Sequence, residues 1–179
     1  MASVEHKTWT YGDGAARTYL CSTDPGLLQL DALNAALGSD MLWWAKALPE
    51  DRLQTLVNNC MIIGLYSLEP ENSGQPIKGN LKRTMIGAAR LITDRVTFGY
   101  LTDVYVLDEH QQRGLGKFLM KCLNEIVESW PELRALWILA SSPENQKMYA
   151  KIFDAQDFFA TNKNPNLKLL EKKGPESSH

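Results

Sequence analysis

The amino-acid sequence predicts a single domain of the mixed α/β class (α+β type), in which helices lie against one central sheet. Its 179 residues, 44% of them hydrophobic, are enough to fill one sizeable core. Apolar runs typical of strands and segments with helical periodicity follow each other along the chain, and no internal repeat marks a second domain. We therefore expect one domain over residues 1–179, with flexible ends at about 1–15 and 171–179.

The first elements are expected between residues 18 and 59. Thr18–Thr23 is short and partly β-branched or aromatic, and a turn signal follows it at 24–26, so this segment predicts a strand. A helix should come next and end at Gly38, which sits where a left-handed cap is needed. Its leucines recur at helical spacing, at Leu27, Leu30, Leu33 and Leu37. A second helix should begin at Pro49, with acidic residues in its first turn, and run to about Asn59.

The middle of the chain predicts a hairpin followed by a central strand. Two strand-like runs, 60–68 and 84–92, flank a segment rich in glycine, proline and asparagine, which predicts a long hairpin loop over 69–83. Val96–Leu107 has apolar residues at both parities, which is typical of a strand covered on both faces.

A strong amphipathic helix is expected after this strand. Its apolar face consists of Leu115, Phe118, Leu119, Cys122, Leu123, Ile126, Val127 and Trp130, and a proline ends it. Leu133–Ala140 predicts a further strand. Ser142 and Pro143 then stand at the N-cap and first position of another helix, and a last strand is expected within Phe158–Leu170.

Composition and charge exclude several classes of function. Nineteen basic and 21 acidic residues give a net charge of −2, so no strong field directs the molecule to nucleic acid or an anionic membrane. Three widely spaced cysteines indicate a reduced, intracellular chain, and three histidines are too few for a histidine-rich metal site. The sequence has no apolar signal core and no 18-residue apolar run. We therefore expect a protein of the cytoplasm or the nucleus, without a membrane span and without a metal.

Two glycines, Gly114 and Gly116, lie at the start of the amphipathic helix, where each costs roughly 1 kcal/mol relative to alanine. A strand that enters a glycine-rich turn and then a helix exposes backbone N–H groups at the positive end of the helix dipole. Glycine also lets the backbone approach a pyrophosphate closely. The pattern therefore predicts an anion site whose donors are the amides of residues 112–117.

Three phosphate-binding patterns can be distinguished here. The nucleoside-triphosphate loop requires a serine or threonine after Gly-Lys, but Phe118 follows Lys117. The dinucleotide fingerprint requires three glycines near the first strand, whereas this segment has two, after about four strands. Gln111 to Gly116 instead match Gln/Arg-x-x-Gly-x-Gly/Ala, and in this motif and the order of elements around it the chain resembles the GNAT superfamily of N-acetyltransferases.

The resemblance implies a fold and a cosubstrate. The implied fold is a mixed central sheet of about six or seven strands, flanked by about four helices and splayed at the central strands. The implied cosubstrate is acetyl-coenzyme A (acetyl-CoA), with its pyrophosphate held by Gln111, Gln112, Arg113, Gly114, Leu115, Gly116 and Lys117. By position, the backbone of Val104, Tyr105 and Val106 pairs with the pantetheine arm and the acetyl carbonyl. Ser142 replaces a family asparagine that often contacts the cofactor.

The resemblance also assigns chemistry to side chains. Tyr149 falls where the family's general acid lies, unless it only anchors a buried stripe. Tyr100 and Asp103 are the candidate bases, with a water chain as the alternative. An isolated aspartate in an apolar strand is costly unless it is paired or functional. Trp43 and Trp44 lie where the family builds the wall of the acceptor pocket, although each could instead cover the edge of the core.

The sequence thus predicts an N-acetyltransferase that transfers the acetyl group of acetyl-CoA directly to a primary amine of a small molecule, within a ternary complex. The alternatives are acetylation of a peptide N-terminus or lysine, a non-catalytic acyl-CoA binder, and an interaction module that kept only the fold. We expect a monomer or a homodimer, with neither nucleic acid nor membrane as partner.

Overall fold

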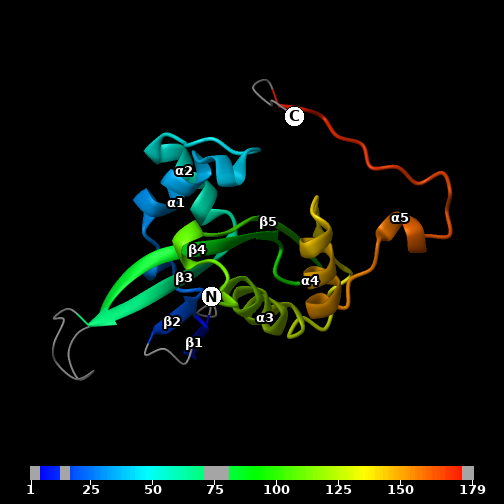
Figure 1. Ribbon diagram of the computed structural model, residues 1–179. Coiled ribbons are helices and arrows are strands. Elements are labelled where there is room, and N and C mark those ends of the chain that lie inside the picture. Colours follow the sequence, from blue (N-terminus) through cyan, green and yellow to red (C-terminus); the bar gives the residue numbers. More distant parts are fainter. Residues whose placement is uncertain (1–4, 13–16, 71–80, 175–179) are drawn as a thin grey trace.

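The computed structural model describes residues 5–12, 17–70 and 81–174, and these residues form one six-stranded sheet with helices on both faces (Figure 1). The strands are β1 (Thr8–Gly12), β2 (Thr18–Ser22), β3 (Met61–Pro70), β4 (Leu81–Thr93), β5 (Phe98–Val106) and β6 (Ala135–Ile138). Each strand pairs with the next one along the chain. Every pair is antiparallel except β5 with β6, which is parallel. The predicted mixed sheet is therefore confirmed.

The helices of the described residues surround this sheet. They are α1 (Leu30–Leu37), α2 (Glu50–Asn58), α3 (Leu115–Val127), α4 (Pro143–Phe153) and the short α5 (Phe158–Thr161). Three single turns of 3-10 helix connect them to the strands: η1 (Pro25–Leu27), η2 (Asp40–Leu42) and η3 (Asp108–His110). The first two helices lie over one face of the sheet, and α3 lies under the other (Figure 1).

Each face of the sheet has its own buried cluster. Alternate residues of a strand join different clusters: Leu20 packs with residues of α1 and α2, whereas the next residue, Cys21, packs with residues of α3. Ile62 and Ile63 divide in the same way on β3. This alternation follows from the two-residue period of a strand, and it gives the central strands apolar side chains on both faces.

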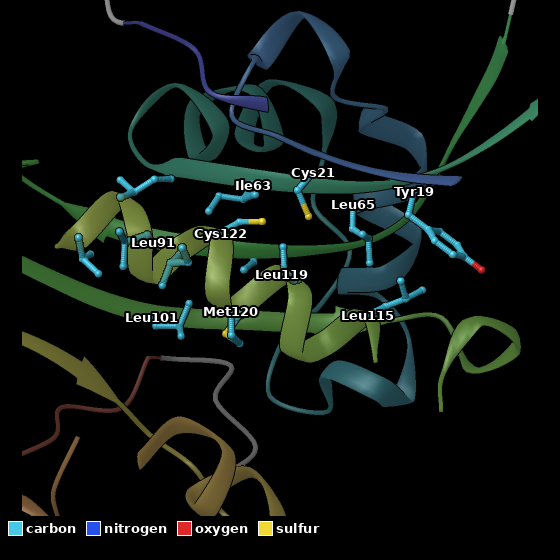
Figure 2. Close-up of a cluster of buried hydrophobic side chains, with 14 of the residues drawn as sticks. Tyr19, Cys21, Ile63, Leu65, Leu91, Leu101, Leu115, Leu119, Met120 and Cys122 are labelled. Carbon is cyan, nitrogen blue, oxygen red and sulfur yellow. The ribbon is translucent and has the colours of Figure 1, made fainter. Parts of the chain in front are cut away.

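The predicted apolar face of α3 is confirmed. Leu115, Leu119, Cys122, Leu123, Ile126 and Val127 are buried, and Phe118 and Trp130 pack against the same cluster. Figure 2 shows Leu115, Leu119 and Cys122 of this face beside Cys21, Ile63 and Leu65 of the sheet. Met120 is also fully buried, which the sequence pattern did not predict. Because each fully buried leucine contributes roughly 1.5–3 kcal/mol, this face holds the N-terminus of α3 firmly against the sheet.

The two neighbours of β5 pair with it over different lengths. β6 pairs with Phe98–Leu101 only, whereas β4 continues to pair as far as Val106. Beyond Leu101, the edge of β5 that faces β6 has no strand partner among the described residues. The expected splay of the central strands is therefore present at this point.

A bulge lies at the start of this unpaired stretch. Arg90 of β4 is opposite Thr102, and Ala88 is opposite Tyr105, so one residue of β4 faces two residues of β5. The extra residue is Asp103, whose φ of +48° is left-handed. As a consequence, Val104 packs on the α3 side and Tyr105 is buried on the α1 side.

Three N-terminal expectations differ from the structure. Thr8–Gly12 forms β1, although it lies within the segment for which we expected flexibility, because β2 offers it a complete antiparallel partner. Gly38 caps α1 with a φ of −89° rather than a left-handed one. Glycine is needed there because a larger residue has no room: a Cβ at this position would lie 3.0 Å from the Cβ of Ala47. Pro49 is the N-cap of α2 rather than its first residue.

The C-terminal strand expected within Phe158–Leu170 is wrong. Asp157 instead starts α5 by accepting hydrogen bonds from the amides of Phe159 (2.9 Å) and Ala160 (3.2 Å), and the following segment leaves the body of the domain (Figure 1). The predicted hairpin between β3 and β4 is confirmed by their pairing. Most of its loop, 71–80, lies outside the described residues.

Candidate active site

The loop between η3 and α3 has an unusual backbone at two residues. Gly114, the N-cap of α3, has a φ of +78°, and Gln112 has a φ of +61°. This alternation of left-handed and right-handed residues turns successive amides toward one side, which is the geometry of an anion-binding nest. Gly114 fits because glycine adopts this conformation without strain.

The amides of this loop are free for a ligand. In the described part of the chain, no protein acceptor receives a backbone hydrogen bond from residues 112–117, and the first amide to bond within α3 is that of Phe118, which donates to the Gly114 carbonyl at 3.0 Å. Unpaired donors at the positive end of a helix dipole attract an anion. The amides that the sequence assigns to an anion site are therefore unpaired among the described residues, and the site itself stays a prediction.

Gly116 shows where the ligand has room. A Cβ built on this residue would have no atom within 4 Å, and its φ is not left-handed, so neither packing nor backbone strain within the protein requires glycine here. The Cβ would instead project into the open space beside the free amides. This cradle fits a phosphate group that must come close to the backbone.

The long side chains of the loop hold the loop itself. Gln111 donates from Nε2 to the Val106 carbonyl at 2.9 Å and to Asp108 at 2.7 Å. Arg113 donates to the Tyr19 hydroxyl at 3.2 Å and to the Glu109 carbonyl at 2.8 Å. The sequence motif predicts that both residues hold the cosubstrate. In the structure both side chains bond to the protein, and of the two residues only Arg113 keeps a backbone amide that is unpaired within the described chain, because that of Gln111 donates to the Asp108 carbonyl.

The remaining loop side chains differ in exposure. Gln112 and Lys117 are exposed, and Leu115 is buried in the cluster under the sheet. The Lys117 side chain therefore lies on the solvated helix face that its position in the sequence indicates.

Tyr149 lies in the same buried cluster as Leu115, the first residue of α3. It comes from α4, which packs against α3, and its ring centroid is 6.3 Å from that of Phe153. Burial raises the pKa of the Tyr149 phenol above its ordinary value of 10.0, so the phenol keeps its proton at neutral pH. A protonated phenol of this kind is available as a proton donor.

Ser142 has a structural task at the start of α4. Its hydroxyl accepts a hydrogen bond from the Asn145 amide at 3.1 Å, which makes it the N-cap that its position before Pro143 predicts. A cosubstrate contact by Ser142 remains a prediction.

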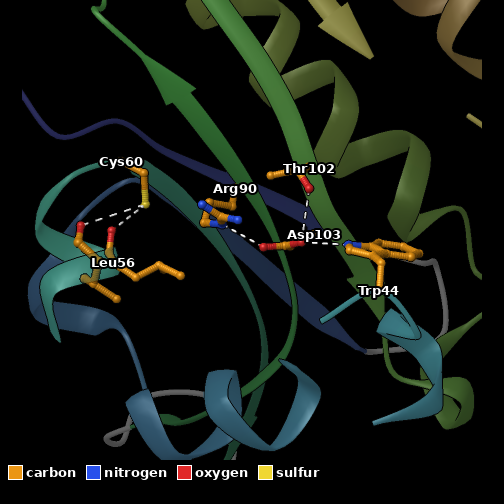
Figure 3. A network of polar contacts seen from close by, with 7 residues as sticks. Trp44, Leu56, Cys60, Arg90, Thr102 and Asp103 are labelled. Atoms are coloured by element: carbon orange, nitrogen blue, oxygen red, sulfur yellow. Dashed lines mark hydrogen bonds and ion pairs between the residues drawn. The ribbon is translucent and has the colours of Figure 1, made fainter. Parts of the chain in front are cut away.

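On the opposite side of β5, the Asp103 carboxylate is surrounded by donors (Figure 3). The Arg90 Nε lies 2.6 Å from Oδ2, while the Trp44 indole N–H donates to Oδ1 at 3.0 Å and the Thr102 hydroxyl donates to the same oxygen at 3.1 Å. The residue is only 4% exposed. These three bonds, one of them an ion pair, satisfy the charge that makes an isolated aspartate costly in an apolar strand.

The two tryptophans form an exposed aromatic pair beside this carboxylate. Trp43 is 60% exposed and Trp44 is 40% exposed, so neither is a core residue. Their rings meet edge to face, with centroids 5.6 Å apart. They follow η2, which packs against β5. The second candidate base, Tyr100, lies in the paired part of β5, opposite Ile92 of β4 and Trp137 of β6.

Arg90 is a polar residue of this region that the sequence motifs did not point to. It lies in the run 84–92, which is otherwise mostly apolar. A single arginine in such a strand is as costly as a single aspartate in the next one, and the two together indicate an ion pair. That joint signal was available in the sequence.

Neither a metal cluster nor a membrane-spanning helix occurs among the described residues. No group of three or more histidine, cysteine, aspartate or glutamate side chains in this part of the chain is placed to hold a metal ion. None of its helices is both long enough and apolar enough to cross a membrane.

Comparisons with known proteins agree with this geometry. The model of the acetyltransferase (GNAT) family matches residues 39–154. A candidate acetyltransferase of Gibberella zeae is 39% identical over 177 residues, covering 97% of this chain and 96% of that protein.

Solved structures extend the likeness to the fold. The crystal structure of a candidate GNAT acetyltransferase of Xanthomonas campestris has a TM-score of 0.60 at 28% identity, covering 88% of this chain and 94% of that one. A Staphylococcus aureus protein with a TM-score of 0.56 at 15% identity, covering 87% of this chain and 99% of that one, shows a likeness of fold alone. The chain therefore belongs to the GNAT family of acetyl-CoA-dependent acetyltransferases.

Proposed function

We propose that this acetyltransferase transfers the acetyl group directly to a primary amine of a small molecule, within a ternary complex. The observation that carries this proposal is the row of free amides at residues 112–117, which follows directly on the unpaired edge of β5. The amides suit the pyrophosphate of acetyl-CoA. The open backbone of Val104 suits the pantetheine arm and the acetyl carbonyl, and Gln111 already covers the carbonyl of Val106.

The chemistry needs two contributions from the protein, besides an acceptor for the proton of the amine. Backbone donors on β5 polarise the thioester carbonyl, as an oxyanion hole does. The amine nitrogen then forms a bond to the carbonyl carbon while the bond from that carbon to sulfur breaks, and the nitrogen loses a proton. In this scheme Tyr149 gives its proton to the departing thiolate and regains one from water, a role that suits a phenol whose pKa burial has raised.

Direct transfer is supported by the burial of the cysteine thiols, which makes them poor nucleophiles. Cys21 and Cys122 are buried between β2 and α3 (Figure 2), where a hydrogen bond with the Cys122 thiol, together with burial, raises the pKa of Cys21. Burial also raises the pKa of Cys60, whose thiol donates to the Leu56 carbonyl. Thiols with raised pKa values are poor nucleophiles. An acetyl-cysteine intermediate is therefore not part of the proposal.

The proton of the attacking amine needs an acceptor other than Asp103. All three donors around that carboxylate are already bonded to it, and Arg90 neutralises its charge. We assign deprotonation to Tyr100 or to a water chain, and we assign Asp103 to holding the site together.

The exposed pair of Trp43 and Trp44, which we call the acceptor wall, suits the binding of a small amine. Trp43 and Trp44 offer two exposed indole rings, and the nearest buried carboxylate is already paired. A flat apolar group or an alkylammonium binds such rings by stacking or by cation–π interaction. We infer that the acceptor carries a group of this kind close to its primary amine.

A screen for thiol release tests the proposed function. Acetyl-CoA is offered with arylalkylamines, polyamines, amino sugars, aminoglycosides and peptides, and release of free coenzyme A is measured. We expect the arylalkylamines, and the polyamines with their second alkylammonium group, to react best. Preferential turnover of peptides would overturn the small-molecule assignment in favour of a protein acetyltransferase.

Isothermal titration with acetyl-CoA and a Tyr149→Phe variant complete the test. We expect binding in both proteins, with kcat reduced about 100-fold or more in the variant because the acid is lost. Unchanged turnover in the variant would refute the role of Tyr149. Tight binding without turnover of any amine would indicate a non-catalytic acyl-CoA binder, and no binding would indicate an interaction module.

A further inference from the structure

The ion pair between Arg90 and Asp103 joins β4 to β5, and Trp44 of the aromatic pair contacts its carboxylate. Arg90 is on β4 and Asp103 on β5, and their side chains are 18% and 5% exposed. The distance of 2.6 Å from Nε to Oδ2 is that of a strong charge-assisted hydrogen bond. Two charges this deep in a protein remain stable only when they are paired.

The pair also fixes a strained backbone. Asp103 is the extra residue of the β5 bulge and has a left-handed φ of +48°. Such a conformation persists only where surrounding contacts over-determine it. Arg90 supplies the strongest of these contacts, because it alone brings a full opposite charge.

The other carboxylate oxygen of Asp103 reaches a distant part of the chain. Its Oδ1 accepts from the Trp44 indole N–H at 3.0 Å, across 59 residues of sequence. The Thr102 hydroxyl donates to the same oxygen and restricts the rotation of the carboxylate. Trp44 is 40% exposed, so the protein packs around its ring only in part. The hydrogen bond to Asp103 is therefore what fixes the orientation of the indole (Figure 3).

We propose that Arg90 is a positioning residue for the acceptor: through Asp103, it holds the Trp44 indole, and with it the edge-to-face pair of Trp43 and Trp44, in the orientation that receives the amine. The site it serves takes the flat apolar or cationic part of the amine. Arg90 bonds to Asp103 and not to the loop amides of residues 112–117, which the proposed function assigns to the pyrophosphate of acetyl-CoA. The proposal rests on the proposed function for the identity of this wall.

A purely structural role for the ion pair makes a different prediction. If Arg90 only stabilised the sheet, its replacement would lower the melting temperature and leave the KM for the amine and the environment of Trp44 unchanged. A positioning role requires both the KM and the Trp44 indole to respond. The experiment must therefore include readouts other than stability.

The test compares Arg90→Met, Arg90→Lys and the control Arg83→Met. Methionine keeps the length of the arginine stem without its charge, and lysine keeps the charge without the Nε donor. Arg83 is an exposed arginine on the same strand. The readouts are titration with acetyl-CoA, the KM for phenethylamine or for the best amine from the screen, and the indole N–H resonance that Trp44→Phe removes from the ¹⁵N spectrum.

For Arg90→Met, we expect the amine KM to rise about tenfold, the affinity for acetyl-CoA to stay within about twofold because the loop is unaltered, and the Trp44 indole resonance to shift. Arg90→Lys should recover part of the KM, and Arg83→Met should match the wild type in all three readouts. An unshifted indole resonance with an unchanged amine KM would overturn the proposal.

Two further outcomes keep the test decisive. If Arg90→Met does not fold, Trp44→Phe, which keeps an aromatic ring but cannot donate to Asp103, should raise the amine KM about fivefold with acetyl-CoA affinity intact. An unchanged KM in that variant would overturn the role of the wall. If the wild type turns over no amine, the proposed function fails, and the indole resonance of Arg90→Met still decides whether Arg90 positions Trp44.

Discussion

The loop before α3 and the bulge at Asp103 are built in opposite ways, although both belong to the second half of β5 and its continuation. The loop consists of consecutive residues and leaves its backbone donors unpaired for a ligand. The bulge gathers residues from β4, β5 and the segment after η2, and every donor there is bonded to one carboxylate. In the proposed function, the loop is therefore a binding surface made of backbone, and the bulge is a support made of side chains.

This difference predicts different responses to substitution. A backbone surface tolerates changes of side chain unless the new side chain occupies the space of the ligand. A buried network of side chains responds to the loss of any member, because an unpaired partner is left behind. Loop substitutions that fill the space of the ligand should change ligand affinity, and substitutions at the bulge should change stability and the acceptor wall together.

The largest effect is expected for Gly116→Val. The new side chain meets no protein atom at its Cβ but fills the space beside the free amides, so the affinity for acetyl-CoA should fall about 100-fold, the loss of about two charge-assisted hydrogen bonds. Titration calorimetry measures the affinity, and thermal melting should change by only a few degrees. Gly116→Ala is the graded control. A Gly116→Val protein that binds as tightly as the wild type would show that the cradle is elsewhere.

The loop could be predicted from the sequence because its information is local. Two glycines, a preceding strand and a following amphipathic helix lie within thirty or so residues, and the structure places them as expected. The bulge itself could not be predicted, because hydrophobic alternation carries no signal for an inserted residue, although the lone Arg90 and the lone Asp103 in neighbouring apolar strands did indicate an ion pair. The indole of Trp44 reaches that carboxylate only through the tertiary fold.

The chain ends show the same limit. β1 is short and depends on β2 for its pairing, and its alternating threonines and aromatic residues are a strand signal too short to decide the matter alone. The segment Phe158–Leu170 has apolar residues suited to a strand, but the capping carboxylate of Asp157 and the proline within the segment favour a helical turn and then an irregular path. Local capping outweighs strand propensity where no neighbouring strand completes a ladder.

Asp103→Asn should give the next largest effect. The amide still accepts hydrogen bonds from Trp44 and Thr102, but it leaves the Arg90 charge largely buried and unpaired, so unfolding in denaturant should show a loss of roughly 2 kcal/mol. The affinity for acetyl-CoA should change little. Equal stability of this variant and the wild type would mean that solvent already screens Arg90, and the contrast between loop and bulge would be lost.

Gly114→Ala should have a smaller effect on stability and almost none on affinity. Alanine at a φ of +78° is strained by roughly 1 kcal/mol, and its Cβ would lie 3.3 Å from the Tyr11 hydroxyl, which must shift slightly. The amides keep their direction if the turn survives. Thermal melting and titration together separate the roles of the two glycines. Substitution of Gly114 should lower mainly the melting temperature, and substitution of Gly116 should lower mainly the affinity for acetyl-CoA.

The smallest effect is expected at Asp94, the exposed counterpart of Asp103 in the turn before β5. The Thr97 hydroxyl and the amides of Val96, Thr97 and Phe98 donate to its carboxylate and lower its pKa below the ordinary 3.8. A lowered pKa in the folded state means that this carboxylate stabilises the fold fully at neutral pH, and that its contribution disappears as the pH falls below about 4. Asp94→Ala should therefore melt slightly below the wild type at pH 7, with the difference shrinking in acid and both KM values unchanged. A gap of unchanged size at pH 2 would contradict the electrostatic origin of the effect, because the contribution must shrink as the pH falls below the unfolded pKa. A shift in the amine KM would show that the turn acts on the acceptor wall and not only on the start of β5.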